Sequence, residues 1–473
     1  MFPTMRKHIA SLLCDEDPDC RRVAAEALGE VRNLAALTAL AAALKDDSKG
    51  VRDAASRSLL AIGGSNAARA IVEYIADENI ATRNLASDLL VKLGSVSIPA
   101  LLPYLSDADE DVRKFAVDIL GMIRENVPAA SLYPLLHDPD QNVVLAAVEA
   151  LGNIRQPEAV PHLLRCFDEQ PYTRAAVVEA LGKIQDPRAS SFLLERFQKE
   201  IAQAAPDPLL LFVLLEALGL LGDAAALSVL EVTASSMRGK LRNALIHALV
   251  AISERTGSNL DWSRFPLSAL IEALHDDDPG ICLSAAKALL TIMSTDVTAE
   301  LLGALGKDDE LDALLRSALM RRSQVFQLVP QQLKRAGARG KREMISLLGS
   351  LAAQMVERFA SKQSMPVDEH TLHEAFDAVA AEWNDAEEET RMAIVETLFR
   401  LDGDRAVAFL ATIANDPDPW LRVRALELTA AVADPRMPAF LAQFLEDEDE
   451  MVRETAAQIL NAKGYSFEQA EEA

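Results

Sequence analysis

The sequence predicts an all-α fold of stacked helical hairpins, because one short motif recurs along almost the whole chain. Its clearest copy is DADEDVRKFAVDILG at residues 107–121. Most copies follow one another after 29 to 31 residues, with three longer intervals of 37, 40 and 50 residues. A period of this length, sustained over fourteen copies, is typical of a repeat array rather than of one globular core. The anchor residues equivalent to Val112 are Cys20, Val51, Thr82, Val112, Val143, Thr173, Leu210, Leu241, Ile281, Leu311, Gly340, Thr390, Leu421 and Val452.

One copy shows how each hairpin forms. Residues 97–105 are a short apolar segment with Pro99 in a tolerated first-turn position, which predicts a first helix. The acidic residues at 107–111 can cap the next helix and suit its dipole. In the second helix, over 112–123, apolar residues at 0, +4, +7, +8 and +11 from Val112 form one stripe. Gly121 then allows either close packing or the turn out.

Composition limits the classes of function. Half of the residues are hydrophobic but only 5% are aromatic, so we expect a core of Ala, Leu, Val and Ile. There are 47 basic and 72 acidic residues, and 47 − 72 gives a net charge of −25. Such a chain repels phosphate backbones, which argues against nucleic acid and favours basic or mixed-charge protein partners.

The cysteines and the N-terminus point to the cytoplasm. The four cysteines form no C-x-x-C pair, and free thiols are typical of a reducing compartment. No secretory signal is recognisable at the N-terminus, and no run approaches the roughly 20 apolar residues that span a bilayer. We therefore expect a cytoplasmic protein with no membrane insertion.

The repeated pattern D-x-D…V-R-x-x-A-x-x-A-L-G resembles the HEAT-repeat family, in particular the short bacterial type that also occurs in bilin lyases. The closing Ala-Leu-Gly stands, for example, at residues 27–29, 150–152 and 180–182. The resemblance covers about residues 11 to 463. It implies a right-handed α-solenoid, a HEAT-like superhelix of about fourteen hairpins, whose second helices line the concave side.

Irregular spacings divide the array. We expect regular N-terminal repeats at 1–197, divergent central repeats with longer connections at 198–353, a helical insertion at 354–383, and C-terminal repeats with an acidic tail at 384–473. The interval at 354–383 is long enough to add a whole helix to the usual hairpin.

A basic residue follows the anchor in most copies. Carboxylates stand just upstream of each anchor, so these side chains can pair with them in the same or in an adjacent repeat. We interpret the column as a structural ladder rather than as an anion site. It comprises Arg21, Arg52, Arg83, Arg113, Arg174, Arg242, Arg391, Arg422 and Arg453.

A second column, six residues after the anchor, is acidic in eight copies. It lies at the edge of the apolar stripe, so stacked repeats would align its carboxylates along the concave surface. The alternative is that Glu is simply a good exposed helix former there. As partner-binding candidates these residues are Glu26, Asp88, Asp118, Glu149, Glu179, Glu216, Glu396 and Glu427.

The acidic column lapses in copies eight to eleven, where basic residues gather between 316 and 342. This stretch could recognise a mixed-charge partner or support self-association through the acidic C-terminal end. Solvated helix faces are the commoner explanation of such charge runs.

Catalysis has little support in the sequence. His370 and His373 could offer two ligands from one helix face, but the other histidines are isolated. No nucleophile elbow, phosphate-binding loop or dinucleotide fingerprint is present. We therefore expect no catalytic, cofactor-binding or metal-binding residues and no cofactor.

The leading hypothesis is a non-enzymatic scaffold that binds a partner protein along the concave face, where the acidic column favours a basic or amphipathic segment. The alternative is a subunit of an enzyme like the bilin lyases, which attaches a chromophore or modifies another protein. That alternative comes from the family resemblance alone, because fold does not determine function.

Overall fold

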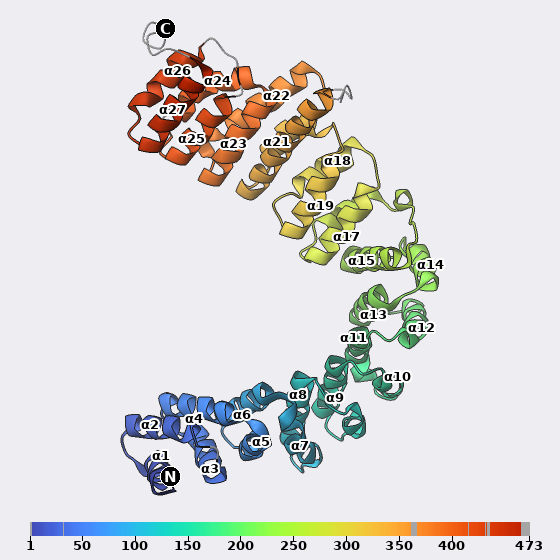
Figure 1. Cartoon of the computed structure of the whole chain (residues 1–473). Helices are drawn as coiled ribbons and strands as arrows, with labels where there is room; N and C mark the ends of the chain where they lie inside the picture. Colours follow the sequence, from blue (N-terminus) through green and yellow to red (C-terminus); the bar gives the residue numbers. More distant parts are fainter. Residues whose placement is uncertain are drawn as a thin grey trace. The chain divides into compact units, whose positions relative to one another are not determined.

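A computed structural model describes residues 2–31, 33–360, 367–414, 416–430, 432 and 436–464 of the 473-residue chain. Within this part the chain forms 27 α-helices, short 3-10 helices and no strand (Figure 1). The helices group into fourteen hairpins, one for each copy of the motif. The fold is therefore an all-α solenoid, as the period predicted.

The second helix of each hairpin carries the motif. In thirteen copies the anchor is the third residue of this helix, and in the sixth copy Thr173 directly precedes it. The second helices are α2 (Pro18–Gly29), α4 (Lys49–Ile62), α6 (Ile80–Leu93), α8 (Glu110–Ile123), α9 (Gln141–Ile154), α11 (Arg174–Ile184), α13 (Pro208–Leu221), α15 (Gly239–Thr256), α17 (Pro279–Leu290), α19 (Asp309–Leu319), α21 (Ala338–Ala360), α23 (Glu388–Leu401), α25 (Pro419–Thr429) and α27 (Glu450–Lys463).

Most first helices are shorter than the second helix of the same copy, and several continue as 3-10 turns. They are α1 (Phe2–Cys14), α3 (Leu34–Ala42), α5 (Gly64–Val72), α7 (Ile98–Leu101), α10 (Val160–Glu169), α12 (Ser190–Ile201), α14 (Ala224–Thr233), α16 (Leu267–Leu274), α18 (Thr295–Gly303), α20 (Val325–Leu333), α22 (Glu369–Ala381), α24 (Gly403–Ile413) and α26 (Met437–Gln443). The 3-10 helices are η1 (Ala43–Lys45), η2 (Glu73–Ala76), η3 (Gly94–Ser97), η4 (Leu102–Ser106), η5 (Ala129–Ser131), η6 (Tyr133–His137), η7 (Pro157–Ala159), η8 (Pro171–Thr173), η9 (Pro187–Ala189), η10 (Trp262–Arg264), η11 (Trp383–Asp385) and η12 (Phe444–Glu446). In the fifth copy, η5 and η6 take the place of the first helix.

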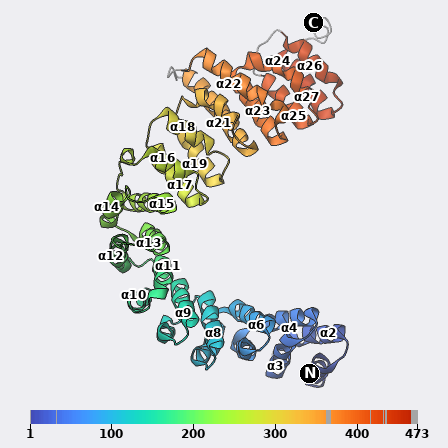
Figure 2. The ribbon, with the colours of Figure 1, turned by 180° about the vertical axis from the view of Figure 1, so that it is seen from behind.

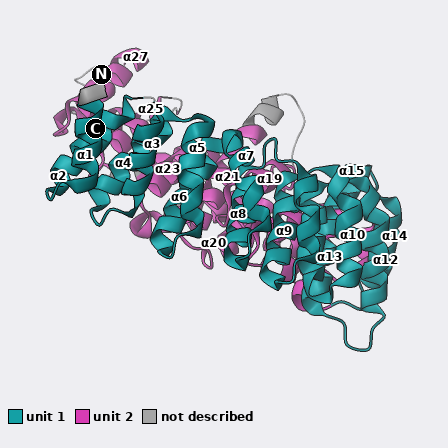
Figure 3. Ribbon diagram, turned by 90° about the horizontal axis from the view of Figure 1, so that it is seen from below, with its two compact units in different colours: residues 1–237, 251–258 teal, residues 238–250, 259–473 magenta. Residues whose placement is uncertain are grey.

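The chain divides into two compact units (Figure 3). Unit 1 comprises residues 1–237 and 251–258, and unit 2 comprises residues 238–250 and 259–473. The division falls inside the segment predicted as divergent, residues 198–353. The four-part division by repeat regularity stays a prediction. In unit 1, α9, α11 and α13 lie along the inner side of the curve of hairpins, and α10, α12 and α14 lie along its outer side (Figures 1 and 2).

Aspartates start the second helices. Asp109 caps α8 by accepting a hydrogen bond from the backbone N–H of Asp111, 2.8 Å away. Asp140 and Asp278 cap α9 and α17 in the same way. Such caps satisfy donors that the first helical turn leaves free. The acidic turns of the motif are therefore explained by local backbone chemistry.

Small residues at the ends of the second helices set the spacing between neighbouring copies. Gly121 lies inside α8, so it serves close packing rather than the turn out. A Cβ atom at Gly121 would lie 2.8 Å from the Cβ of Ala150, and one at Gly152 would lie 2.8 Å from the Cα of Ala180. Only glycine permits these two approaches, whereas a Cβ at Gly182 would lie 3.6 Å from its nearest neighbour and has room.

The predicted helical insertion at 354–383 does not add a helix to the described residues. The second helix of the eleventh copy, α21, extends over 23 residues to Ala360. The next helix, α22, is the ordinary first helix of the twelfth copy. The helix continues through Gly349, so the first residues of the interval extend α21 instead; residues 361–366 and the acidic tail after 464 lie outside the described residues.

One stretch bears on the prediction that no segment is apolar enough to span a bilayer. Residues Ile80–Ser106 pass a test of length and mean hydropathy for a membrane helix, and they are the only helical stretch among the described residues that does. A core helix of a soluble protein passes the same test. In the structure, this stretch is divided at Gly94, whose φ is 71°, into α6 and the short helices η3, α7 and η4.

Candidate protein-binding surface

In four copies, the arginine that follows the anchor pairs with the aspartate 25 residues further on, in the acidic turn of the next hairpin. Arg113 donates two hydrogen bonds of 2.8 Å to the carboxylate of Asp138, which lies 25 residues further on in the next acidic turn. The same interval separates the partners in the other three pairs. These pairs are Arg21–Asp46, Arg391–Asp416 and Arg422–Asp447.

These carboxylates also order their own turns. Asp138 accepts a hydrogen bond from the backbone N–H of Asp140. Burial alone would raise the pKa of Asp138, but the hydrogen bonds from Arg113 and from that N–H outweigh it and hold the pKa below its ordinary value. Arg113 also donates to the carbonyl of Asp107 in its own copy. One side chain therefore links two successive turns.

The remaining arginines of the column make other contacts. Arg52 and Arg453 donate to carbonyls of their own acidic turns, and Arg174 donates to the carbonyl of Phe167. Arg83 lies over the ring of Phe115, and Arg242 pairs with Glu272. In that eighth copy Asn243 takes over the bond to the next acidic turn, at 2.8 Å from Asp276. The role of the column as a register-setting ladder stays a proposal.

The acidic column divides into paired and unpaired members. Five members form ion pairs, whereas Glu149 and Glu179 are exposed and have no hydrogen-bonding or ion-pair partner among the described residues. Glu216 is half-buried and has a contact of its own. The ion pairs are Glu26 with Arg22 and Arg57, Asp88 with Lys92, Asp118 with Lys114, Glu396 with Arg400 and Arg424, and Glu427 with Arg424.

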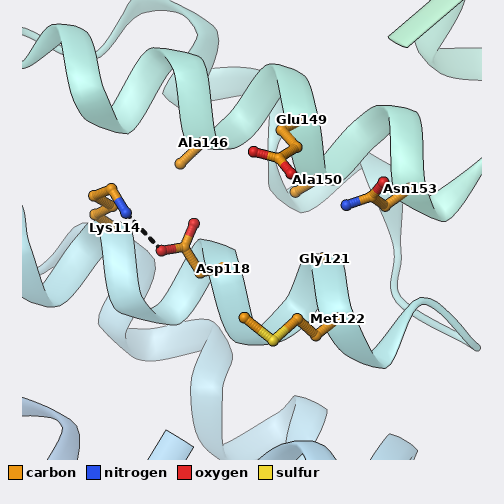
Figure 4. A pocket seen from close by; sticks show the side chains of 8 residues that line it. All are labelled: Lys114, Asp118, Gly121, Met122, Ala146, Glu149, Ala150 and Asn153. Atoms are coloured by element: carbon orange, nitrogen blue, oxygen red, sulfur yellow. Dashed lines mark hydrogen bonds and ion pairs between the residues drawn. The ribbon is translucent and has the colours of Figure 1, made fainter. Parts of the chain in front are cut away.

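A first groove, of about 270 Å³, lies between α8 and α9 beside these carboxylates (Figure 4). Asp118 and Met122 come from α8, and Glu149 and Asn153 come from α9. Met122 is 57% exposed. The groove therefore combines an apolar wall with a free carboxylate.

A second groove, of about 410 Å³, lies between α11 and α13 and repeats the first in register. Its carboxylates, Glu179 and Glu216, occupy the same motif position as Asp118 and Glu149. Leu220, which is 50% exposed, occupies the position of Met122. This groove is larger partly because a Cβ at Gly182 would lie 3.6 Å from Ala217, well beyond the closest approach at Gly121.

Polar residues adopt positive φ at the ends of three second helices, and two of them, Arg155 and Gln185, have the left-handed helical conformation. Twelve residues after the anchor, copies two and three place Gly63 and Gly94 at positive φ. Copies four to six place Arg124, Arg155 and Gln185 there, with φ values of 61°, 58° and 58°. Non-glycine residues pay a cost in this region. Arg155 and Gln185 line the second groove.

The basic stretch at 316–342 is largely neutralised by neighbours. Arg322 is buried and donates to the carbonyls of Leu290 and Ile292, and burial lowers its pKa. Arg321, Lys334 and Arg335 are exposed. Four others form ion pairs across copies. These are Arg316–Glu343, Arg339 with Asp309 and Asp312, Lys341–Glu382 and Arg342–Glu389.

The two neighbouring histidines pair with carboxylates. His370 lies 3.8 Å from Glu374, and His373 lies 3.6 Å from Asp402. Among the residues that the structure describes, no group of three or more His, Cys, Asp or Glu side chains is arranged to hold a metal ion.

Comparison with known proteins identifies the repeat. The HEAT-repeat family matches residues 6–91, 98–173 and 129–205. A search of curated proteins found no match. Among solved structures, a chain of the Kap95:Nup1 complex is similar to this chain with a TM-score of 0.48 and 11% identity, over 100% of this chain and 74% of that one. A chain from a structure of Kap95p binding to RanGDP gives 0.45 and 13%, over 100% and 84%.

The matched residues carry the motif that builds the hairpins of unit 1. The short bacterial, bilin-lyase type is not distinguished by this match and stays a prediction. The HEAT-repeat match covers residues 6–91 and 98–205, and the later hairpins of the structure carry the same motif on their second helices.

Proposed function

We propose that this protein is a non-enzymatic scaffold of the cytoplasm, and that it binds a partner protein along the second helices of unit 1. The surface runs over α8, α9, α11 and α13. The partner contributes a basic or amphipathic segment, which the carboxylates of Glu149 and Glu179 attract.

One observation carries this proposal. Of the eight acidic-column residues, Glu149 and Glu179 are exposed carboxylates that no described side chain neutralises, and each lines a groove with an exposed apolar wall. A basic partner can pair with a free carboxylate at a small cost in free energy, because no ion pair within the protein has to break first. The apolar walls can bury partner surface, which supplies most of the affinity in protein interfaces.

The net charge supports the same partner chemistry. A chain with a net charge of −25 attracts cationic segments over a distance of about one Debye length, roughly 8 Å at physiological salt. Such attraction raises the association rate and helps to select the partner.

The test is charge reversal at the two free carboxylates. Full-length wild-type protein and the Glu149→Arg/Glu179→Arg variant capture partners from the native cell extract, and the partner enriched by the wild type is then purified and titrated. We expect the variant to bind it at least tenfold more weakly. The matched control is Glu78→Arg/Glu158→Arg, which changes the charge equally at exposed residues away from the grooves. Equal affinity of the two variants would refute the proposal.

A further inference from the structure

The two grooves of unit 1 are lined by the same motif positions, but Met122 lies on the α8 wall of the first groove and Leu220 lies on the α13 wall of the second. Both grooves lie at the same level of the second helices, because Met122 and Leu220 occupy the same motif position, as do Asp118 and Glu179. Between them, Gly152 packs against Ala180, and Lys183 donates a 3.2 Å hydrogen bond to Asn153. A line from one groove to the other therefore crosses α9 and α11.

We propose that the bound segment of the partner is extended, crosses these helices, and places two apolar side chains six residues apart, one in each groove. Basic side chains two and four residues after the first apolar one face Glu149 and Glu179. This inference rests on the proposed function and specifies its partner.

The spacing follows from the geometry of packed helices. Neighbouring helices pack about 8–10 Å apart, so two steps along the stack cover about 16–20 Å. An extended chain advances about 3.3 Å per residue, and every second side chain points to the same face. Six residues then cover about 20 Å with both apolar side chains on one face, whereas four residues cover only about 13 Å.

The charges assign the residues in between. Glu149 comes from α9 and Glu179 from α11, the two helices that lie between the grooves. The side chains at the third and fifth positions of the segment face these helices, so lysine or arginine there meets a free carboxylate. A helical segment fits less well, because covering the same distance at 1.5 Å per residue needs about 13 residues.

The test uses synthetic peptides of one composition. The probe is a fluorescein-labelled peptide with leucine at positions 1 and 7, lysine at 3 and 5 and serine elsewhere, between Gly-Ser ends. Its isomers place the leucines four residues or thirteen residues apart. Fluorescence anisotropy with the full-length chain is expected to show the first peptide binding about tenfold more tightly than either isomer.

Substitutions at the groove walls complete the test. We expect Met122→Ala and Leu220→Ala each to weaken the first peptide about threefold to tenfold and to leave the isomers unchanged. Leu209→Ala is the matched control, because Leu209 is an exposed leucine of the same helix as Leu220 but lines neither groove.

The outcomes separate this inference from the proposed function. Equal binding of all isomers, or insensitivity to both wall substitutions while Glu149→Arg/Glu179→Arg still abolishes binding, would overturn the two-groove inference and leave the scaffold proposal standing. If charge reversal also leaves every peptide's affinity unchanged, the basic-segment proposal fails as well.

Discussion

The acidic column contains both paired and free carboxylates in unit 1, whereas both of its members in unit 2 are paired. In unit 1, Glu149 and Glu179 are free carboxylates. In unit 2, Arg424 lies 3.0 Å from Glu396 and 2.9 Å from Glu427, so one guanidinium holds both column members. A repeated acidic position is therefore no guide to binding until the cations of the neighbouring copy are known.

The basic ladder, by contrast, is alike in both units. Arg113–Asp138 in unit 1 and Arg422–Asp447 in unit 2 have the same sequence interval, and every partner in them is nearly buried. The units thus share their internal construction and differ in the surface that it presents. The predictions below test each half of this comparison.

The largest loss of stability is expected when an arginine of the ladder is removed. Arg113→Ala leaves the buried carboxylate of Asp138 without its cation, which should cost about 3 kcal/mol of local stability. Arg422→Ala should cost a similar amount in unit 2. Hydrogen–deuterium exchange of α8 and α9, or of α25 and α27, measures this free energy of opening.

Arg52→Ala provides the control for the ladder. Arg52 donates to the carbonyls of Asp46 and Asp47, while Lys45 pairs with Asp77, the carboxylate 25 residues after Arg52. We expect a cost of about 1 kcal/mol, typical of lost hydrogen bonds. A cost equal to that of Arg113→Ala would show that the inter-repeat ion pair adds nothing.

The ladder should also be sensitive to acid. The pKa of Asp138 is held below its ordinary value of 3.8, so its contribution is present above that pH and is lost as the pH falls through the lowered value. Asp138→Asn should therefore cost most near neutral pH and progressively less below about pH 4. Exchange of α8 and α9 at several pH values checks this, and a cost independent of pH would contradict it.

The next largest change in stability is expected at glycines where neighbouring second helices pack together. Gly121→Ala forces a methyl group to within 2.8 Å of Ala150 and should cost about 1–3 kcal/mol. In unit 2, Gly349→Ala meets the Oγ1 of Thr397 at 2.5 Å and should behave alike. Gly182→Ala meets its neighbours at 3.6 Å, so it should be neutral or should stabilise α11 by up to about 1 kcal/mol. Equal costs at Gly121 and Gly182 would contradict the difference between the two grooves.

The sequence period was enough to locate the hairpins, the aspartate caps and the identity of the second helices. It could not reveal which carboxylates are free, because Arg424 reaches Glu396 from 28 residues away, through a helix contact in the next copy. The grooves were also missed, since their walls are two apolar residues, Met122 and Leu220, in a column that is otherwise mostly polar. Met122 and Leu220 differ from the polar residues or alanine that most other copies have ten residues after the anchor.

The positive φ at the ends of these second helices could also have been predicted from the sequence. The position twelve residues after the anchor is Gly63 and Gly94 in copies two and three, so Arg124 and Arg155 stand where glycine is preferred. The length of α21 was missed although residues 351–360, LAAQMVERFA, contain no glycine or proline and consist mostly of good helix formers.

The smallest effect is expected when Glu396 and Glu427 of unit 2 lose their cations and become free carboxylates, as Glu149 and Glu179 are in unit 1. Arg400→Gln together with Arg424→Gln removes the cations from Glu396 and Glu427 while keeping the side chains polar. A lysine-rich peptide should then bind the full-length chain about twofold to fivefold more tightly at low salt, since each exposed ion pair contributes only a fraction of a kcal/mol. The gain should vanish near 0.5 M salt, where exposed charges are screened. Arg264→Gln with Arg405→Gln removes two charges from unit 2 away from the column, and an equal gain there would mean that net charge alone, rather than the freed column, attracts the peptide.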